Sequence, residues 1–481
     1  MRRNLVIEEI LISATPFGVR TALVSDGHIR ALYAESHARP RLLDNIYKAA
    51  PGRQGGAARF VTIAAGQSAY MSEASGTNAD TADAIVQVVR ESAAGKAPRV
   101  STAPALAGRY LVYFPHGANA NVARRIDDEA ERARLLAIGQ SLSATVGSVT
   151  LRSAAEGMAE ELLRAEAARL RSRWCDIVAN SEKTAAPALL LAGPTLAERL
   201  LRDAPPGAVK RILVDDRTTL ANLSAYAEQE APEMRAGMEF AGDVLFERHD
   251  AAGALSAALT PEVALPGGGR LTIEPTQALT VIDVDSGART GGREAVLRAT
   301  CTEAATAAAA EIRRRNLAGL IVIDFPRLSG ADARAALLAD MRAKMSDDPT
   351  AHKVVEISAS GLMEITRRRA ETPLLEVLTE AAAGDDHDGY GGYGGRQARL
   401  DALAFDIADQ ARHQVRAGMR RMTLHMAPEL ADYLARFDSH AGGAENRTLG
   451  EWLGAEITVR HVPEYRRDQW LIETTIKSAA Q

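Results

Sequence analysis

Residues 271–330 read LTIEPTQALTVIDVDSGARTGGREAVLRATCTEAATAAAAEIRRRNLAGLIVIDFPRLSG, and this segment is the clearest indication of the fold in the sequence. It holds two apolar, β-rich runs, ALTVIDVDSG and GLIVIDFPRLSG, and the alanine-rich segment between them is long enough for a crossover helix. The pattern predicts two neighbouring strands joined by a helix. Asp283, Asp285 and Asp324 stand where the apolar runs end, so their carboxylates are expected to meet at one edge of a sheet.

The three acids have two interpretations. Clustered carboxylates repel one another unless a positive group compensates them, and hard oxygen ligands suit a hydrated Mg²⁺ ion, with Mn²⁺ as the other candidate. A carboxylate-bound divalent ion is what phosphodiester hydrolysis needs. The alternative is that each acid is a strand-end residue satisfied by turn amides. Spacing and charge alone leave the two interpretations evenly balanced.

The two runs resemble the catalytic signature of the ribonuclease E/G family, in which a strand T-x-I-D-x-N-S-G is followed further along the chain by G-L-I-V-I-D-F. Here they read T-V-I-D-V-D-S-G at 280–287 and G-L-I-V-I-D-F at 319–325. The resemblance implies that Asp283 and Asp324 hold one Mg²⁺. It also implies that Asp285 takes the catalytic position of the family's Asn, which orients the water.

Composition describes a folded protein of several domains, with 481 residues of which 46% are hydrophobic. Because the net charge is −5, any affinity for nucleic acid must come from local basic patches. Only 4% of the residues are aromatic, which disfavours a protein that serves purely to bind single-stranded nucleic acid. Two distant cysteines, Cys175 and Cys301, favour neither a disulfide nor a zinc site and indicate a reducing, cytoplasmic location. We expect no signal peptide and no membrane span.

The order of elements resembles the same family along most of the chain. It implies an α/β and α+β multidomain fold: an RNase H-like subdomain with inserted domains, then a catalytic domain and a small C-terminal domain. The implied boundaries are 1–45 plus 203–260 (RNase H-like), 46–106 (shortened S1, or OB, domain), 107–202 (5′-sensor), 261–380 (DNase I-like catalytic domain), 381–397 (Gly/Asp-rich linker) and 398–481 (small α+β domain).

The linker separates this chain from the family's best-known members. It lacks the Cys-x-x-Cys with which those members share zinc between subunits, so zinc is not expected. Its run Asp385-Asp386-His387-Asp388 is interpreted as an acidic tag rather than a metal site, because the surrounding composition forbids a packed core. The C-terminal domain is expected to serve packing and self-association, which leaves a homo-oligomer open.

The S1-like part carries residues expected to contact RNA. Phe60 and Tyr70 match aromatic residues that stack on bases, and Arg90 and Lys96 match cations that bind phosphates. Without the resemblance, both rings would be taken for barrel core. The first strand of the barrel reads AAPGRQGGAAR at 49–59, which is too rich in Gly and Pro for a central strand, so a partial barrel is expected.

Further basic residues match the 5′-sensor. Arg152-Ser153 resembles the Arg-Thr pair that holds the terminal monophosphate of RNA, and Arg124-Arg125 resembles a basic pair that reaches RNA nearby. The alternative is that all four are ordinary exposed polar residues. GLMEITRRRAETP at 361–373 resembles the family's next helix, whose arginines at 367–369 would face either the RNA backbone or solvent.

The resemblance implies a metal-dependent endoribonuclease that cleaves single-stranded RNA and leaves 5′-phosphate and 3′-hydroxyl ends. The alternative is a catalytically impaired RNA-binding or assembly protein of the same family. The eroded S1 strand, Asp285, and Ala359-Ser360 in place of a family arginine favour this alternative. The retained pair of Asp283 and Asp324 favours the enzyme.

Overall fold

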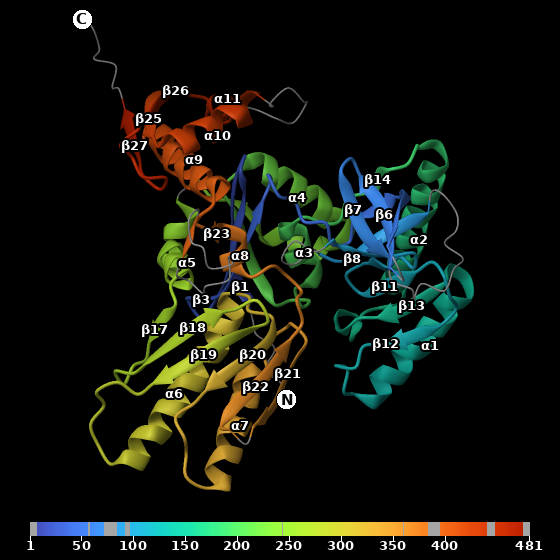
Figure 1. The fold of residues 1–481 in the computed structure, drawn as a ribbon. Coiled ribbons are helices and arrows are strands. Elements are labelled where there is room, and N and C mark those ends of the chain that lie inside the picture. The colour runs from blue at the N-terminus through green and yellow to red at the C-terminus, as the bar shows by residue number, and fades with distance from the viewer. Residues whose placement is uncertain are drawn as a thin grey trace, which may run out of the picture. The chain divides into compact units, whose positions relative to one another are not determined.

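The computed structural model describes residues 7–55, 58–71, 84–91, 97–242, 244–358, 360–382, 395–439 and 448–474. The chain divides into two compact units, which we describe one at a time (Figure 1). The first comprises Met1–Pro40, Ala208–Ala221 and Gly237–Gln481, and the second comprises Arg41–Gly207 and Asn222–Ala236. Among the described residues, no helix has both the length and the apolar character that crossing a membrane requires.

A five-stranded sheet opens the first unit, in the order β16-β15-β1-β2-β3. Its strands are β1 (Ile7–Thr15), β2 (Gly18–Ser25), β3 (His28–Ser36), β15 (Val209–Val214) and β16 (Met238–Phe240). Asp26 and Gly27 form a two-residue hairpin turn between β2 and β3, with φ of 51° at Asp26 and 71° at Gly27, as a turn with both central residues left-handed requires. η3 (Leu245–Asp250) and α5 (Ala251–Ala258) pack beside β3 of this sheet. α4 (Arg217–Glu230) and η2 (Pro232–Gly237) each contain residues of both units.

A six-stranded sheet carries the stretch that decides the fold. Its order is β17-β18-β19-β20-β22-β21, with two helices. The elements are β17 (Glu262–Ala264), β18 (Arg270–Pro275), β19 (Leu279–Asp285), α6 (Arg293–Arg314), β20 (Gly319–Asp324), α7 (Ala331–Met345), β21 (His352–Ile357) and β22 (Leu362–Arg367). β19 and β20 are parallel, so the predicted strand–helix–strand unit is confirmed.

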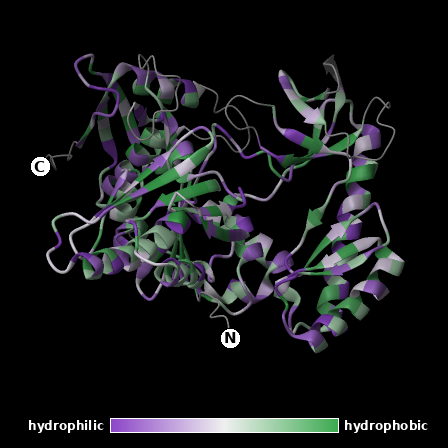
Figure 2. Cartoon of the chain, turned by 60° about the horizontal axis from the view of Figure 1, so that its bottom comes forward, coloured by the Kyte–Doolittle hydropathy of each residue, from purple (hydrophilic) through white to green (hydrophobic). Residues whose placement is uncertain are grey.

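One face of this sheet is buried and the other is open. Ile282 and Ile323 join the alanines of α6, such as Ala304 and Ala308, in one core cluster. Alanine side chains let the helix approach the sheet closely, which explains the alanine-rich composition. Figure 2 shows the strands largely in the hydrophobic colour, while the helices alternate between the two colours.

The prediction of a helix at 361–373 was wrong. Residues Leu362–Arg367 form β22, which pairs with both β20 and β21. Met363, Ile365 and Arg367 are buried, whereas Thr366, which lies between two of them in the sequence, is exposed. This is the two-residue alternation of a half-buried strand. The β-branched residues Ile365 and Thr366 favour this conformation as well.

The second unit contains a seven-stranded sheet in the order β14-β4-β8-β9-β7-β6-β5. Its strands are β4 (Ile46–Lys48), β5 (Ala50–Gly55), β6 (Ala58–Ala64), β7 (Gln67–Met71), β8 (Ile85–Arg90), β9 (Arg99–Ser101) and β14 (Ala188–Leu191). Only Ala49 separates β4 from β5, so one bent segment pairs with β8 at one end and with β6 at the other, and the strands close on themselves.

This closure corrects the expectation of a partial barrel. The Gly- and Pro-rich run forms β5, and its register with β6 shifts between Pro51 and Gln54. Gly52 allows the close approach, because a Cβ there would lie 2.5 Å from the carbonyl oxygen of Phe60. An irregular strand thus accommodates the residues that would break a regular one.

The same unit holds a four-stranded sheet in the order β10-β11-β13-β12, covered by helices. Its elements are β10 (Leu106–Ala107), β11 (Leu111–Phe114), β12 (Ala120–Val122), α1 (Glu129–Val146), β13 (Ser148–Leu151), η1 (Ser153–Ala155), α2 (Glu160–Lys183) and α3 (Leu196–Asp203). β12 and β13 run parallel, so both end at the same edge of the sheet.

The C-terminal part of the first unit is an α+β piece with its own core. Its elements are α8 (Leu374–Leu378), β23 (Thr379–Ala381), β24 (Arg396–Ala398), α9 (Leu400–Arg416), β25 (Arg421–Met426), α10 (Pro428–Ser439), α11 (Leu449–Leu453), β26 (Glu456–His461) and β27 (Trp470–Thr474). The order of its sheet is β26-β25-β27. The acidic run at 385–388 lies outside the described residues.

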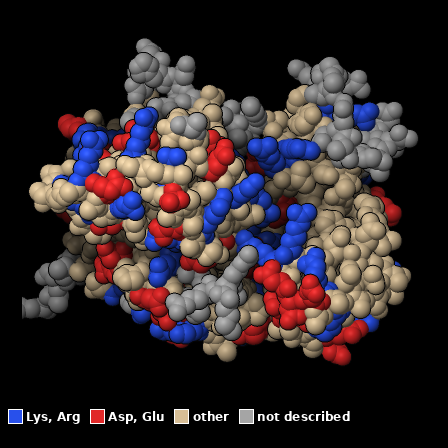
Figure 3. All heavy atoms as spheres, turned by 90° about the horizontal axis from the view of Figure 1, so that it is seen from below, with Lys and Arg blue, Asp and Glu red and all other residues tan. Residues whose placement is uncertain are grey.

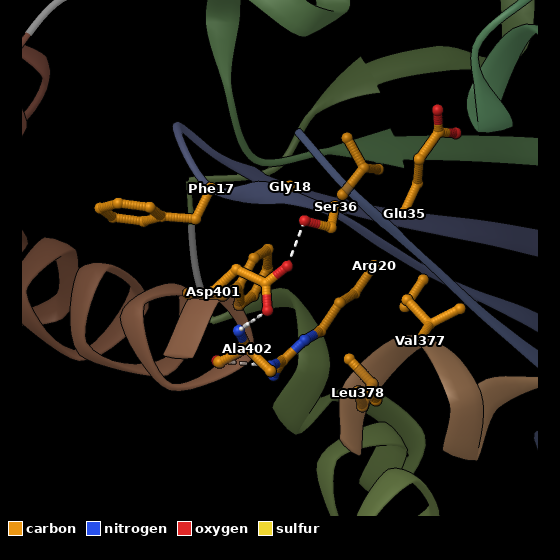
Figure 4. Close-up of a pocket in the computed structure, with 12 residues that line it drawn as sticks. Phe17, Gly18, Arg20, Glu35, Ser36, Val377, Leu378, Asp401 and Ala402 are labelled. Carbon is orange, nitrogen blue, oxygen red and sulfur yellow. Dashed lines mark hydrogen bonds between the residues drawn. The ribbon is translucent and has the colours of Figure 1, made fainter. Parts of the chain in front are cut away.

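Polar contacts attach helix α9 to the first sheet. Asp401 accepts hydrogen bonds from the Ser36 hydroxyl and from the Arg39 guanidinium, the latter at 2.8 Å, beside a small pocket (Figure 4). Further along α9, Arg412 pairs with the buried Asp215 at 2.7 Å. Both acids are nearly inaccessible, so these contacts are structural.

Candidate functional site

The paired register of β19 and β20 places Asp283 directly opposite Asp324. Both side chains are exposed, whereas the neighbouring Ile282 and Ile323 are buried, so the two acids lie on the open face of the sheet. Adjacent strands are about 4.8 Å apart, which lets two opposed carboxylates reach one small cation. Among the described residues the side chain of neither acid has a hydrogen bond or an ion pair, so the turn-amide alternative has no support at these two positions.

Asp285 does not join the pair, which corrects the expectation that three carboxylates converge. Its Oδ1 accepts a hydrogen bond from the Gly287 amide at 2.9 Å, and its Oδ2 lies 3.3 Å from the Arg270 guanidinium. Within the described ranges no three His, Cys, Asp or Glu side chains are arranged to hold a metal ion together. The turn-amide interpretation therefore describes Asp285.

Two carboxylates with open positions fit Mg²⁺. This ion dehydrates reluctantly, keeps several waters and is commonly held by only one or two protein carboxylates. Mn²⁺ accepts the same oxygen ligands. The donor set of Asp283 and Asp324 therefore suits a hydrated hard cation and does not suit zinc, which prefers four nitrogen or sulfur ligands in structural sites.

Arg367, expected to face RNA or solvent, is buried instead. Its guanidinium forms a bidentate ion pair with Asp348, at 2.7 and 3.1 Å, and also donates to Asn316 and to the Leu317 carbonyl. Both partners of the pair are almost inaccessible. Arg367 therefore holds the loop after α6 and the turn after α7 against β22. The neighbouring Arg368 and Arg369 are exposed.

A row of four side chains crosses the closed sheet of the second unit. Phe60 stands opposite Tyr70, Tyr70 beside Arg99, and Arg99 beside Arg90, on strands β6, β7, β9 and β8. The two ring centroids are 6.0 Å apart with the rings inclined at 62°. We call these residues the aromatic–arginine row.

The aromatic–arginine row faces outward. Val61, Ala69 and Met71 alternate with the two rings and form the interior core, whereas Phe60 and Tyr70 are only half-buried. The barrel-core interpretation of the two rings was therefore wrong. No sequence pattern points to Arg99, and only its register with Tyr70 identifies it. Lys96 lies outside the described residues.

The four predicted sensor residues meet at one edge of the four-stranded sheet. Arg124 and Arg125 follow β12, Arg152 and Ser153 follow β13, and the Ala123 amide donates to the Leu151 carbonyl between them. Arg124, Arg125 and Ser153 are exposed.

Arg152 is already bound by the protein. Its guanidinium donates to the Gly108 carbonyl and, at 2.7 Å, to Asp203. Burial alone would raise the pKa of Asp203, but the hydrogen bonds and charges of Arg202 and Arg152 lower that pKa to about 2. Asp203 is therefore ionised at neutral pH, and a phosphate that binds Arg152 competes with it.

The surface charge agrees with local rather than global attraction to nucleic acid. Figure 3 shows basic and acidic side chains interspersed over the face it presents, without a continuous field of either sign. The sequence carries 57 Lys and Arg against 62 Asp and Glu, which gives the same balance. The net charge of the chain therefore offers no general attraction to a polyanion.

Comparisons with known proteins agree with this geometry. The model of the Ribonuclease E/G family matches residues 105–370, more than half of the chain. Ribonuclease G of Escherichia coli (strain K12) is 28% identical over 96% of this chain and 98% of its own length. Ribonuclease G of Haemophilus influenzae has the same identity and coverage, and ribonuclease E of Nostoc sp. is 34% identical over 64% of this chain and 45% of its own length. The chain belongs to the ribonuclease E/G family.

Proposed function

We propose that this chain is a metal-dependent endoribonuclease that cleaves single-stranded RNA in RNA processing or decay. The enzyme class follows from the family, because the chain is an endoribonuclease by membership. The observation that carries the metal dependence is the in-register pair of Asp283 and Asp324 on the open face of the six-stranded sheet. We propose that the enzyme acts in the cytoplasm.

The residues of this chain have distinct proposed roles. Asp283 and Asp324 hold Mg²⁺ or Mn²⁺, which when bound stabilises charge on the phosphate and supplies a water of lowered pKa. The rigid pairing of β19 with β20 fixes the separation of the two carboxylates, so little reorganisation is needed when the cation binds. Asp285 stands beside this pair in the position of the family's water-orienting Asn, and the Gly287 amide donates a hydrogen bond to its side chain.

The sheets of the structure are proposed to be the family's subdomains. The β3-β2-β1-β15-β16 sheet is the RNase H-like part, the closed sheet is the S1 (OB) domain, and the β12–β13 edge is the 5′-sensor. The six-stranded sheet with α6 and α7 is the DNase I-like catalytic domain. The C-terminal piece is proposed to support self-association.

The chemistry of the product ends tests the proposal. Attack on the phosphodiester by water leaves 5′-phosphate and 3′-hydroxyl ends, whereas attack by the RNA's own 2′-hydroxyl leaves a 2′,3′-cyclic phosphate. We expect only the former, determined by end-labelling and mass analysis of the fragments. Cyclic phosphate ends that persist in EDTA would contradict the proposed hydrolysis.

The aromatic–arginine row makes a prediction about RNA binding. Phe60→Ala and Tyr70→Ala should each weaken the binding of single-stranded RNA by roughly 5- to 150-fold, because stacking is worth about 1–3 kcal/mol per base. Arg99→Ala should weaken it less and reduce the salt dependence of the dissociation constant. Fluorescence anisotropy with a labelled RNA measures these effects.

A matched control for the aromatic–arginine row is Tyr465→Ala, which removes a half-buried tyrosine from the C-terminal piece. It should leave RNA affinity unchanged. Equal affinities for the Tyr70→Ala, Tyr465→Ala and wild-type proteins would remove the row from the RNA interface.

The Arg152–Asp203 ion pair makes a prediction about 5′-end sensing. Asp203→Asn should increase the preference for 5′-monophosphorylated over 5′-hydroxyl RNA by up to about fivefold, because an ion pair in this range of exposure is worth about 0.2–1 kcal/mol. Arg152→Ala should erase the preference. The measurement is the ratio of initial cleavage rates on the two RNAs, with Glu160→Gln, which removes a carboxylate paired with Arg164, as the control. An unchanged ratio in Arg152→Ala would remove Arg152 from the sensor.

A further inference from the structure

The ion pair between Arg270 and Asp285 lies beside the proposed cation site. β18 and β19 pair in a register that sets Arg270 directly opposite Asp285. One carboxylate oxygen lies 3.3 Å from the guanidinium, and the other accepts the Gly287 amide at 2.9 Å. Gly287 has φ of 61° and so makes the tight turn that brings its amide back to the side chain. Both oxygens of Asp285 are therefore occupied within the protein.

Asp285 is close enough to the cation site to join it if released. Side chains two residues apart on a strand point to the same face, so Asp285 and Asp283 both lie on the open face. They are separated along β19 by two residues, a rise of about 6.6 Å, which side-chain rotation of both acids shortens. What keeps Asp285 apart is its pair of contacts with Arg270 and Gly287.

We propose that Arg270 is a positioning residue that holds Asp285 out of the cation's ligand set and thereby keeps the site at two carboxylates. The inference rests on the proposed function, because it assumes that Asp283 and Asp324 bind the cation. Removal of Arg270 frees one carboxylate oxygen and deletes a positive charge nearby. Each additional carboxylate ligand raises the affinity of an oxygen site for a divalent cation.

Because the Arg270–Asp285 pair is exposed, it can be removed by substitution without unfolding the chain. The side chains of Arg270 and Asp285 are 54% and 45% exposed, so their pairing contributes little to folding. The effect of breaking it should therefore appear in cation affinity. Removing Arg270 could tighten cation binding for two reasons, and the two can be separated. Recruitment of Asp285 as a ligand requires the Asp285 carboxylate, whereas the loss of the positive charge of Arg270 raises cation affinity with or without that carboxylate.

The experiment is a titration of the full chain with Mn²⁺ alone, without RNA, followed by electron paramagnetic resonance of the free ion. Arg270→Ala should bind Mn²⁺ more tightly by on the order of tenfold. Asp285→Asn should bind it about as tightly as the wild type, because Asp285 is not a ligand there. The double variant, Arg270→Ala with Asp285→Asn, should lose most of the gain.

The control is Arg211→Ala, which breaks another exposed arginine–carboxylate pair between neighbouring strands, at 2.9 Å from Glu239. It should leave Mn²⁺ affinity unchanged. Unchanged or weaker binding by Arg270→Ala, or an equal gain with and without the Asp285 carboxylate, would overturn the positioning role while leaving the proposed function intact. A wild type that binds no Mn²⁺, or binds it equally well as Asp283→Asn, would overturn both.

Discussion

Asp283→Asn is expected to reduce the cleavage of single-stranded RNA by about a thousandfold, because a bound metal ion stabilises transition-state charge by several kcal/mol. The amide that replaces the carboxylate keeps the shape of the side chain but removes the charge that holds the cation. Folding should be unaffected, since Asp283 is exposed near the end of β19 and its side chain has no hydrogen bond within the described residues. RNA affinity should also remain, because the aromatic–arginine row is unchanged.

The matched control is Glu274→Gln, which neutralises an exposed acid on the same open face. Glu274 lies on β18, two residues from Thr272, the residue that pairs with Asp283. It should retain near wild-type cleavage. Single-turnover rates with saturating enzyme separate the chemical step from RNA binding. Equal rates for Asp283→Asn and Glu274→Gln would show that the phosphodiester is cleaved elsewhere.

Arg367→Ala is expected to destabilise the catalytic sheet by about 3–5 kcal/mol, because the substitution leaves Asp348 buried without its partner. Arg367 and Asp348 are 2% and 0% exposed, and the guanidinium also satisfies the Asn316 side chain and the Leu317 carbonyl. Thermal unfolding followed by circular dichroism measures the shift, which should be largest in the transition of the first unit.

Two further variants make the Arg367 prediction specific. Arg369→Ala removes an exposed arginine two residues further on, 3.9 Å from Glu376, and should change stability by less than about 0.5 kcal/mol. Arg367→Met combined with Asp348→Leu removes both charges and should recover much of the loss, since paired apolar replacements are often tolerated. A small effect of Arg367→Ala, similar to that of Arg369→Ala, would mean that Arg367 is a surface residue.

The central part of the fold was predictable from local patterns. Two apolar runs of strand length around an alanine-rich helix of 22 residues allow few arrangements other than a parallel strand–helix–strand unit. Because the carboxyl ends of such strands meet at one edge, the approach of Asp283 to Asp324 followed from the same pattern. The exact register of the pair came only from the structure.

Other features depended on contacts that the sequence does not display. Arg367 resembled a solvent-exposed arginine until Asp348, distant in the chain, was found as its buried partner. Without the family resemblance, Phe60 and Tyr70 would have been taken for core residues, because hydrophobicity does not say which face of a strand is inside. Asp285 was expected at the cation site, and only the strand pairing with Arg270 shows what restrains it.

The most direct test of the account is the cleavage of a 5′-monophosphorylated single-stranded RNA by the wild type and by Asp324→Asn, each with Mg²⁺, Mn²⁺ or EDTA. We expect internal cuts by the wild type in either metal, none in EDTA and none by the variant, while both proteins bind the RNA. Cuts that persist in EDTA or in Asp324→Asn would contradict it. Binding without any cut by the wild type would contradict it equally and identify an RNA-binding protein of the same family.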